Sequence, residues 1–271
     1  MIAGFDHVVI AVHDLEAGLA AYTTLLNRQC IARFVSDGVA TAVIELDNIA
    51  VELIAPEGDG EAARRLRAAM ESGEGLKSLA LATANIEAAH RRAERVGLAP
   101  QAISDPASDD SGDYRVFRTN TERTHGVRIF ILERRGGAPN AAPADADGVS
   151  GLDHVVIRSA EMERAAALYS ARLGLDMRLD REVAGRRLMF FRCGNAVVEI
   201  VHDAARGATD ELWGLSWRVG NADAARARLA ALGLDVSEVR AGMKPGSRVF
   251  TVRNTTCGVP TLMIETNSRR G

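Results

Sequence analysis

The sequence predicts an α+β fold built from four copies of one βαβββ module, in which a strand and a helix precede three further strands. The first observation is a repeat, because FDHVVIAVHDLEAGLAAY at residues 5–22 returns as LDHVVIRSAEMERAAALY at residues 152–169. The second is a weaker copy of the same strand–helix pattern within each half, starting near residues 75 and 211. A unit that recurs in this way indicates a fold assembled from repeats.

The first strand and helix of each half follow from the spacing of apolar residues. In the first copy Val8, Ile10 and Val12 alternate with other side chains, which is the period of a β-strand. Asp14 then stands at the N-cap of a helix whose apolar side chains recur on one stripe. The stripe consists of Leu15, Leu19, Tyr22 and Leu26, and its second copy consists of Met162, Ala166, Tyr169 and Leu173.

Three further strands complete the first module. Residues 30–46, CIARFVSDGVATAVIEL, predict two strands that turn near Asp37-Gly38, and residues 49–56, IAVELIAP, predict a third. The stretch 57–75 has an alanine-rich centre between glycines, so we expect a linking helix at about 61–70. Its three arginines are expected to face solvent.

The repeat divides the chain into two domains, residues 1–135 and 151–268, each made of two modules. Between them, residues 136–150 combine Gly, Pro, Ala and Asp without an apolar period, which is typical of a linker. A chain of 271 residues can hold two such domains, each burying its own core. The acidic stretch 103–114 predicts a loop, and its Asp spacing is not that of a calcium-binding EF-hand.

Composition narrows the class of partner. With 33 basic and 36 acidic residues the formal charge is −3, and no basic cluster indicates a nucleic-acid surface, so a small molecule is the expected partner. The apolar runs are strand-sized and the N-terminus lacks the pattern of a secretory signal, so we expect a cytoplasmic protein without membrane spans. Cys30, Cys193 and Cys257 show no CxxC spacing, and we assign them no disulfide or metal role.

The unit that opens with DHVVIAV and DL and closes on VELI resembles the vicinal-oxygen-chelate superfamily, the glyoxalase, bleomycin-resistance and extradiol-dioxygenase group. Within that group the chain looks most like the glyoxalase-like domain proteins, and the likeness covers nearly all of it except residues 57–74 and the linker. The resemblance implies that each pair of modules forms a half-open barrel. In the superfamily its concave side typically holds a divalent metal such as Zn, Ni, Mn or Fe.

In that superfamily the metal ligands are a His on the first strand of a module and a Glu on the last strand. Carried over residue by residue, the resemblance assigns as candidate metal ligands His7, Glu52, His154 and Glu199. The even-numbered modules instead carry Ser78, Phe130, Gly214 and Leu262 at the corresponding positions. Two ligands in each domain leave most coordination positions to water, so we expect neither an intact glyoxalase I site nor an extradiol dioxygenase site. Substrate oxygens could complete a metal site, or Glu133 or Glu265 could do so through a β-bulge.

Without a metal, the His–Glu pairs predict proton transfer, because imidazole titrates near neutral pH and a carboxylate can orient it. We assign His154 and Glu199 as the catalytic candidates, since strand alternation places Arg158 and Arg218 on the same face, where guanidinium groups suit a substrate carboxylate. The equivalent first-domain positions are small and apolar, namely Val9, Ala11, Ala80 and Ala82. The alternatives are a His–Glu pair that only satisfies itself and arginines that only form salt bridges.

Alternation also directs other large side chains. It turns Trp213 and Trp217 to the opposite face of their strand, where we expect them to pack under helices, and helical spacing places His90 against the sheet.

Two functions are compatible with this pattern. One is a lyase or isomerase of the superfamily that acts on a small oxygenated anion. The other is a binding protein of the bleomycin-resistance type that sequesters a compound without chemistry. Open barrels of this type often pair, so a homodimer is compatible with both.

Overall fold

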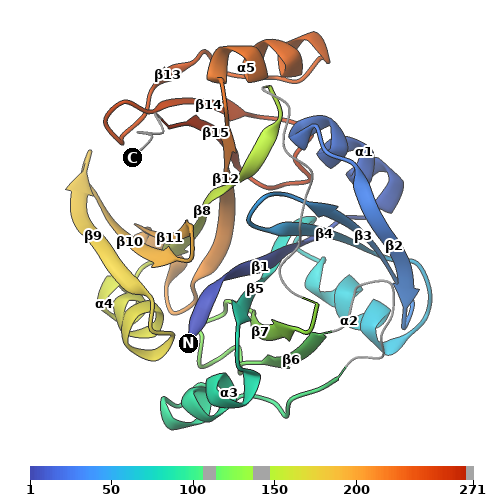
Figure 1. Cartoon of the computed structure of the whole chain (residues 1–271), viewed down its shortest axis with the longest axis vertical. Helices are drawn as coiled ribbons and strands as arrows, with labels where there is room; N and C mark the ends of the chain where they lie inside the picture. The colour runs from blue at the N-terminus through green and yellow to red at the C-terminus, as the bar shows by residue number, and fades with distance from the viewer. Residues whose placement is uncertain (106–113, 137–146, 267–271) are drawn as a thin grey trace. The chain divides into compact units, whose positions relative to one another are not determined.

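The structure of the chain is a computed structural model. It describes residues 1–105, 114–136 and 147–266. Within these residues the strands form two β-sheets and helices pack on them, which confirms the predicted α+β fold (Figure 1). Most of the predicted acidic loop and most of the predicted linker lie outside the described residues.

The seven-stranded sheet is drawn from the first half of the chain. Its elements are β1 (Ile2–Ala11), α1 (Leu15–Leu26), β2 (Cys30–Ser36), β3 (Val39–Glu45), β4 (Ala50–Pro56), α2 (Glu61–Ala69), β5 (Gly75–Thr83), α3 (Ile86–Arg95), β6 (Tyr114–Arg118) and β7 (Ile129–Arg134). The strand order is β2-β3-β4-β1-β5-β7-β6. The first module has the predicted βαβββ order, and in the second an isolated bridge joins Ser104 to Val116 of β6.

The eight-stranded sheet is drawn from the second half. Its elements are β8 (Val149–Ser159), α4 (Met162–Ala166), which continues as a π-helical segment (Ala167–Arg172), β9 (Asp176–Val183), β10 (Arg186–Cys193), β11 (Ala196–His202), β12 (Glu211–Val219), α5 (Ala222–Ala231), β13 (Arg240–Ala241), β14 (Arg248–Val252) and β15 (Thr261–Glu265). The strand order is β13-β14-β15-β12-β8-β11-β10-β9. Both of its modules follow the βαβββ order.

The chain also groups into two compact units, and each draws on both halves of the sequence. The first unit consists of Met1–Val9, Lys77–Ala138 and His154–Trp213, and the second of Ile10–Leu76, Pro139–Asp153 and Gly214–Gly271. The division into domains at 1–135 and 151–268 stays a prediction.

The helices begin where the sequence predicts. Asp14, Asn85 and Asn221 each accept a backbone N–H from three residues further on, at 3.0, 2.8 and 2.9 Å. These side chains satisfy amide groups that have no partner within the helix. Most of the apolar stripe is buried as expected, with Tyr22 and Tyr169 at 0% and 1% exposure, whereas Leu15 and Ala166 are half-buried.

Arginines from distant modules satisfy carbonyl groups at the ends of two helices. Arg172 donates to the carbonyls of Val96 and Gly97, just beyond α3, at 2.9 and 2.6 Å. Arg228 of α5 donates to the carbonyls in the last turn of α1 at 2.7 and 3.1 Å. Carbonyls at a helix end lack partners within the helix and favour a positive charge. Sequence patterns within one module could not reveal these contacts.

The linking helix α2 packs on the first module. Asp37, in the turn between β2 and β3, accepts the backbone N–H groups of Glu61 and Ala62 at 3.0 and 2.7 Å and so caps the helix. At the other end Leu66 and Met70 are buried in a cluster with Ala11, Val39 and Ile54. The three arginines of α2 are exposed, as expected.

The position of α2 matters because of the face that it covers. In the β3–β4 ladder Thr41 lies opposite Ile54 and Val43 opposite Glu52, so Ile54 shares a face with Glu52. Figure 1 shows α1 and α2 on opposite sides of β3 and β4. The face that carries the first candidate carboxylate is therefore partly covered by the buried side of α2.

Replacing Leu66 tests this packing. Leu66→Ala should lower the free energy of unfolding by roughly 2–4 kcal/mol, because it leaves a cavity where α2 meets the strands. Urea denaturation measures the change. The matched control is Arg67→Ala, an exposed position on the same helix, which should change stability by less than about 0.5 kcal/mol. Equal effects of the two substitutions would contradict the packing described.

Candidate functional site

The predicted pair in the second half is brought together by two parallel strands. In the β8–β11 ladder His154 lies opposite Val197 and Val156 opposite Glu199, so His154 and Glu199 share one face. His154 Nε2 lies 3.1 Å from Glu199 Oε2, and the two side chains are 14% and 8% exposed. Their contact is that of a hydrogen-bonded pair held mostly out of water.

The opposite face of these strands explains why the pair is held in place. Val155, Ile157, Val198 and Ile200 are almost completely buried there, and α4 packs beside β11 (Figure 1). A slip of one residue would turn this buried set to the other face, so burial fixes the register. We call the side that carries His154, Val156 and Glu199 the His154 face.

Arg158 lies on the His154 face, four residues after His154, in a cluster of charges. Its Nη2 lies 2.7 Å from Glu211 Oε2 and its Nε 3.3 Å from Asp203 Oδ2. Arg206 Nη1 contacts the same Glu211 oxygen at 2.8 Å. The two arginines and the two carboxylates carry equal and opposite charge. Arg158 thus forms salt bridges within the chain, and its binding of a substrate anion stays a prediction.

Trp213 departs from the sequence prediction. Trp217 is fully buried as expected, but Trp213 is 37% exposed, so the prediction that it packs under a helix was wrong. The guanidinium carbon of Arg158 lies 5.3 Å from the centre of the Trp213 ring, a cation–π contact. The ring lies near the start of β12, beside the charge cluster around Arg158.

Arg218 of β12 pairs with Asp153, with 3.1 Å between Nε and Oδ1. It belongs to the second compact unit, whereas His154 belongs to the first. That Arg218 and Arg158 act together on one substrate stays a prediction.

In the first half, His7 contacts a carboxylate that the sequence reasoning did not name. Its Nδ1 lies 2.8 Å from Oδ1 of the adjacent Asp6, and Arg134 donates to both oxygens of Asp6 at 2.6 and 2.7 Å. Burial would raise the pKa of Asp6, but the hydrogen bonds from His7 and Arg134 outweigh it and lower the pKa from 3.8 to about 2. The pairing of His7 with Glu52 stays a prediction.

Sequence reasoning missed Asp6 and Arg134. The sequence did contain a sign of this contact, because an Asp–His dipeptide lies in the first strand of both halves. The two copies have diverged in use, since Asp6 binds His7 and Arg134 whereas Asp153 binds Arg218.

Asp6→Asn tests the ionised carboxylate. The lowered pKa means that Asp6 stabilises the fold above its unfolded pKa of 3.8 and loses this contribution as the pH falls towards 2. The variant should therefore be less stable by about 2 kcal/mol at pH 7. The difference from the parent should shrink below pH 4 in urea titrations. A difference that is independent of pH would contradict the assignment.

Comparison with known proteins agrees with this architecture. A family profile described as a glyoxalase-like domain matches residues 5–174, more than half of the chain. The chain belongs to the glyoxalase-like domain family. A second profile, described as the glyoxalase, bleomycin resistance protein and dioxygenase superfamily, matches residues 153–251. No curated protein matches the glyoxalase-like chain.

Solved structures share the fold at low sequence identity. A mutant of 4-hydroxymandelate synthase from Streptomyces coelicolor has a TM-score of 0.77 and 13% identity, over 100% of the glyoxalase-like chain and 95% of its own. The Mn(II)-bound glyoxalase from Novosphingobium aromaticivorans has 0.72 and 14%, over 97% and 82%. BphC, a halotolerant catechol dioxygenase, has 0.68 and 14%, over 98% and 87%. These similarities show the fold and leave the activity to the site.

The donor set of the glyoxalase-like chain does not fit a resident metal. Within the described residues, no group of three or more His, Cys, Asp or Glu side chains is placed to hold an ion. Glu265 Oε2 accepts the backbone N–H of Ala222 at the start of α5, at 2.8 Å. Glu133 lies 3.8 Å from Arg115, which pairs with Glu87 of α3. Both carboxylates thus contact partners tied to helices, as alternation predicts, and neither completes a site.

Metal content tests this assignment. After incubation with Mn, Ni, Zn or Fe and dialysis, elemental analysis should find well below one ion per chain, because two ligands leave a divalent ion mostly hydrated. One tightly held ion per chain in the parent, absent from His154→Gln, would contradict it.

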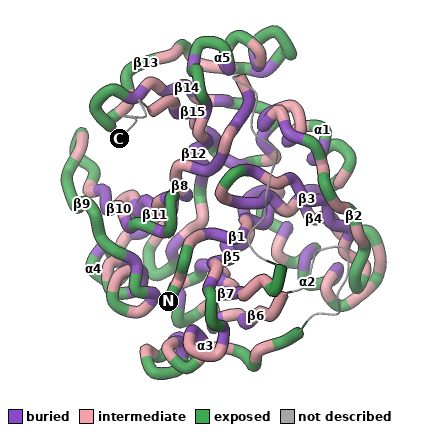
Figure 2. Tube along the Cα trace, viewed as in Figure 1, coloured by how far each residue is buried: buried purple, intermediate pink, exposed green. Residues whose placement is uncertain are grey.

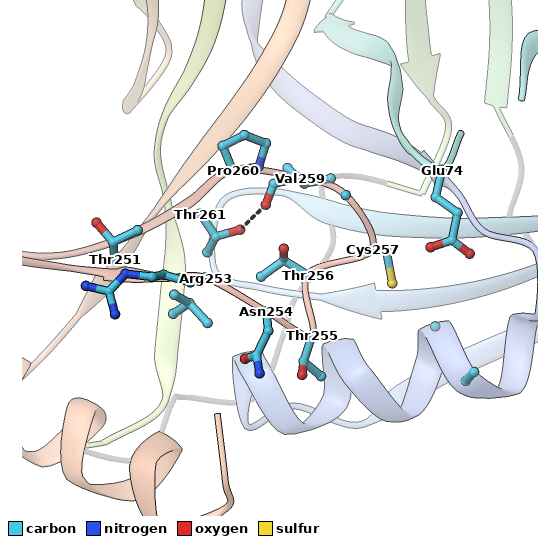
Figure 3. Close-up of a pocket in the computed structure, with 14 residues that line it drawn as sticks. Glu74, Thr251, Arg253, Asn254, Thr255, Thr256, Cys257, Val259, Pro260 and Thr261 are labelled. Carbon is cyan, nitrogen blue, oxygen red and sulfur yellow. Dashed lines mark hydrogen bonds between the residues drawn. The ribbon is translucent and has the colours of Figure 1, made fainter. Parts of the chain in front are cut away.

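The described part of the chain also contains a cavity of about 710 Å³ that includes none of the predicted site residues. The segment 251–261 lines most of it, together with Ala17 and Gly18 of α1 and with Glu74 (Figure 3). Glu74 accepts the backbone N–H of His13 at 2.7 Å, and Arg253 pairs with Asp235 at 2.6 Å.

The Cys257 thiol lines this cavity near Glu74 (Figure 3). Burial, reinforced by the Glu74 charge, raises its pKa to about 11. A thiol that stays protonated at neutral pH is a poor nucleophile.

Within the described residues, the glyoxalase-like protein has no helix of the length and apolar character that a membrane span requires.

Proposed function

We propose that this glyoxalase-like protein is a lyase or isomerase that moves a proton on a small oxygenated anion, with His154 and Glu199 as the proton-transfer pair. The observation that carries the proposal is the 3.1 Å contact between His154 Nε2 and Glu199 Oε2 at low exposure. A carboxylate this close can hold the imidazole in one orientation, so that the ring takes up and returns a proton at a fixed position.

In the proposed reaction the imidazole of His154 accepts a proton from the carbon next to a substrate carbonyl. The C–H electron pair moves into the carbonyl group and gives an enolate, while Glu199 stabilises the imidazolium that forms. Return of the proton to the same or a neighbouring carbon completes an isomerisation, and loss of a leaving group from the enolate completes a lyase reaction. General acid–base catalysis of this type contributes about 10²–10⁴-fold to a rate.

Arg158 is the proposed anion-binding residue. It lies on the His154 face, and its guanidinium is already oriented by Glu211, Asp203 and the Trp213 ring. A substrate carboxylate would replace the longer of its two ion pairs, the 3.3 Å contact with Asp203. Arg218 belongs to the same proposal as a second anion-binding residue.

Proton exchange measures this activity directly. With 2-oxo or 2-hydroxy acids in D₂O, NMR should detect exchange of the proton next to the carbonyl or hydroxyl group. His154→Gln should slow it at least about 100-fold, and Glu199→Gln should slow it through loss of the ion pair. The control His202→Gln, at the end of β11, should leave the rate unchanged. No exchange with any acid in the panel would contradict the proposal.

Sequestration without chemistry is the second candidate. It is favoured by the two-donor site and by the balanced charges around Arg158, which leave no excess positive charge to bind an anion. Tight binders in a thermal-shift screen whose affinity survives both His7→Ala and His154→Ala would support this function over the first.

The proposal also places the protein in the cytoplasm as a homodimer. Cell fractionation and sedimentation of the purified protein test these two points.

A further inference from the structure

An apolar row lies directly beside Glu199 on the His154 face. In the β10–β11 ladder Phe190 is opposite Glu199, and in the β9–β10 ladder Leu179 is opposite Phe190. On the other side Glu199 is opposite Val156 of β8. Residues opposite one another in neighbouring strands have side chains on the same face, so Leu179, Phe190, Glu199 and Val156 form one continuous row.

The outer part of this row is open to solvent. Leu179 is 42% exposed and Phe190 is half-buried, whereas Val156 is only 8% exposed. Figure 2 shows β9 as an exposed strand, in agreement with its seven exposed residues of eight. An exposed Leu179 and a half-buried Phe190 thus lie next to the proposed catalytic carboxylate. Apolar side chains that lie beside a polar pair in this way can receive the apolar part of a ligand.

A third exposed apolar side chain contacts a residue of this face. Trp213, 37% exposed, lies against Arg158, and Arg158 shares the His154 face. The pair of proton-transfer residues is therefore flanked by Phe190 and Leu179 in one direction and by the Arg158–Trp213 contact in another. A small polar metabolite without an apolar substituent would leave this surface exposed to solvent.

Strand spacing gives the size of the group that would fit. Neighbouring strands lie about 4.8 Å apart, so Leu179, two strands away, is about 10 Å from Glu199. Apolar atoms touch at about 4 Å, so a group that starts beside Glu199 contacts Leu179 once it extends about 5–6 Å. A phenyl ring or a chain of four to six carbons has roughly that length. Burying it on Phe190 and Leu179 would remove apolar surface of both partners from water.

We infer that the substrate carries an aryl or alkyl group of this size, which packs on Phe190 and Leu179 while its acidic carbon meets His154. This inference rests on the proposed function for the position of the reacting carbon. The apolar subsite itself rests only on the strand register and on the exposed side chains.

The test compares 2-oxo acids of increasing side-chain length, from pyruvate through 2-oxobutanoate and 2-oxohexanoate to phenylpyruvate. Calorimetry on Glu199→Gln measures the dissociation constants while turnover is slowed, and kinetics on the parent protein measure KM and kcat. Affinity should rise by up to about threefold to fourfold for each methylene. In Leu179→Ser combined with Glu199→Gln, this dependence on length should be lost for the longer acids.

Val35→Ser is the matched control, because Val35 is a 63% exposed apolar residue on the edge strand β2 of the other sheet. It should leave the length dependence unchanged. Phe190→Leu, which keeps the apolar surface, should retain alkyl binding and weaken phenylpyruvate.

The outcomes separate this inference from the proposed function. Length-dependent binding without any proton exchange would overturn the proposed function and leave the subsite in place. Proton exchange together with affinities that do not depend on side-chain length would overturn the subsite. A length dependence that persists in Leu179→Ser would also overturn it. A change of oligomeric state in Leu179→Ser, with unchanged ligand binding, would show that a second copy of the chain covers this surface and would also overturn it.

Discussion

The parallel pairing of β8 with β11 is the constraint on which the candidate site depends. His154 and Glu199 lie far apart in the sequence, and they meet because Val155, Ile157, Val198 and Ile200 must be buried on the other side of the same two strands. Hydrophobic burial thus sets the register, and the register sets the distance between imidazole and carboxylate. The chemistry is a consequence of how the opposite face is packed.

The two repeated halves share one scaffold but differ in the contacts of their corresponding residues. Tyr22 donates to the carbonyl of Thr256 at 3.3 Å, whereas the buried hydroxyl of its counterpart Tyr169 has no hydrogen-bond partner within the described residues. In the first half α2 covers part of the face that carries Glu52, and Arg134 holds Asp6. These features favour a structural role for the first half and a ligand-binding role for the second.

The charge cluster around Arg158 shows the limit of reasoning from residue type. An arginine on the predicted face suggested an anion site, and strand alternation did place it there. Its partner Asp203 directly follows β11, and its partner Glu211 is the first residue of β12. No period within β8 encodes these contacts. The same cluster includes the exposed Trp213, whose ring contacts the Arg158 guanidinium.

The sequence alone determined the elements and the faces of this protein. Its repeat, its Asp and Asn caps and its strand alternation are local signals, so they predicted the βαβββ modules, the buried stripe with Tyr22 and Tyr169, and the shared face of His154 and Glu199. Only the tertiary structure decided the partners: His7 and Arg134 for Asp6, carboxylates for Arg158 and Arg218, and Leu179 beside Phe190. Those contacts depend on ladder register and loop course, which join residues that no local pattern relates.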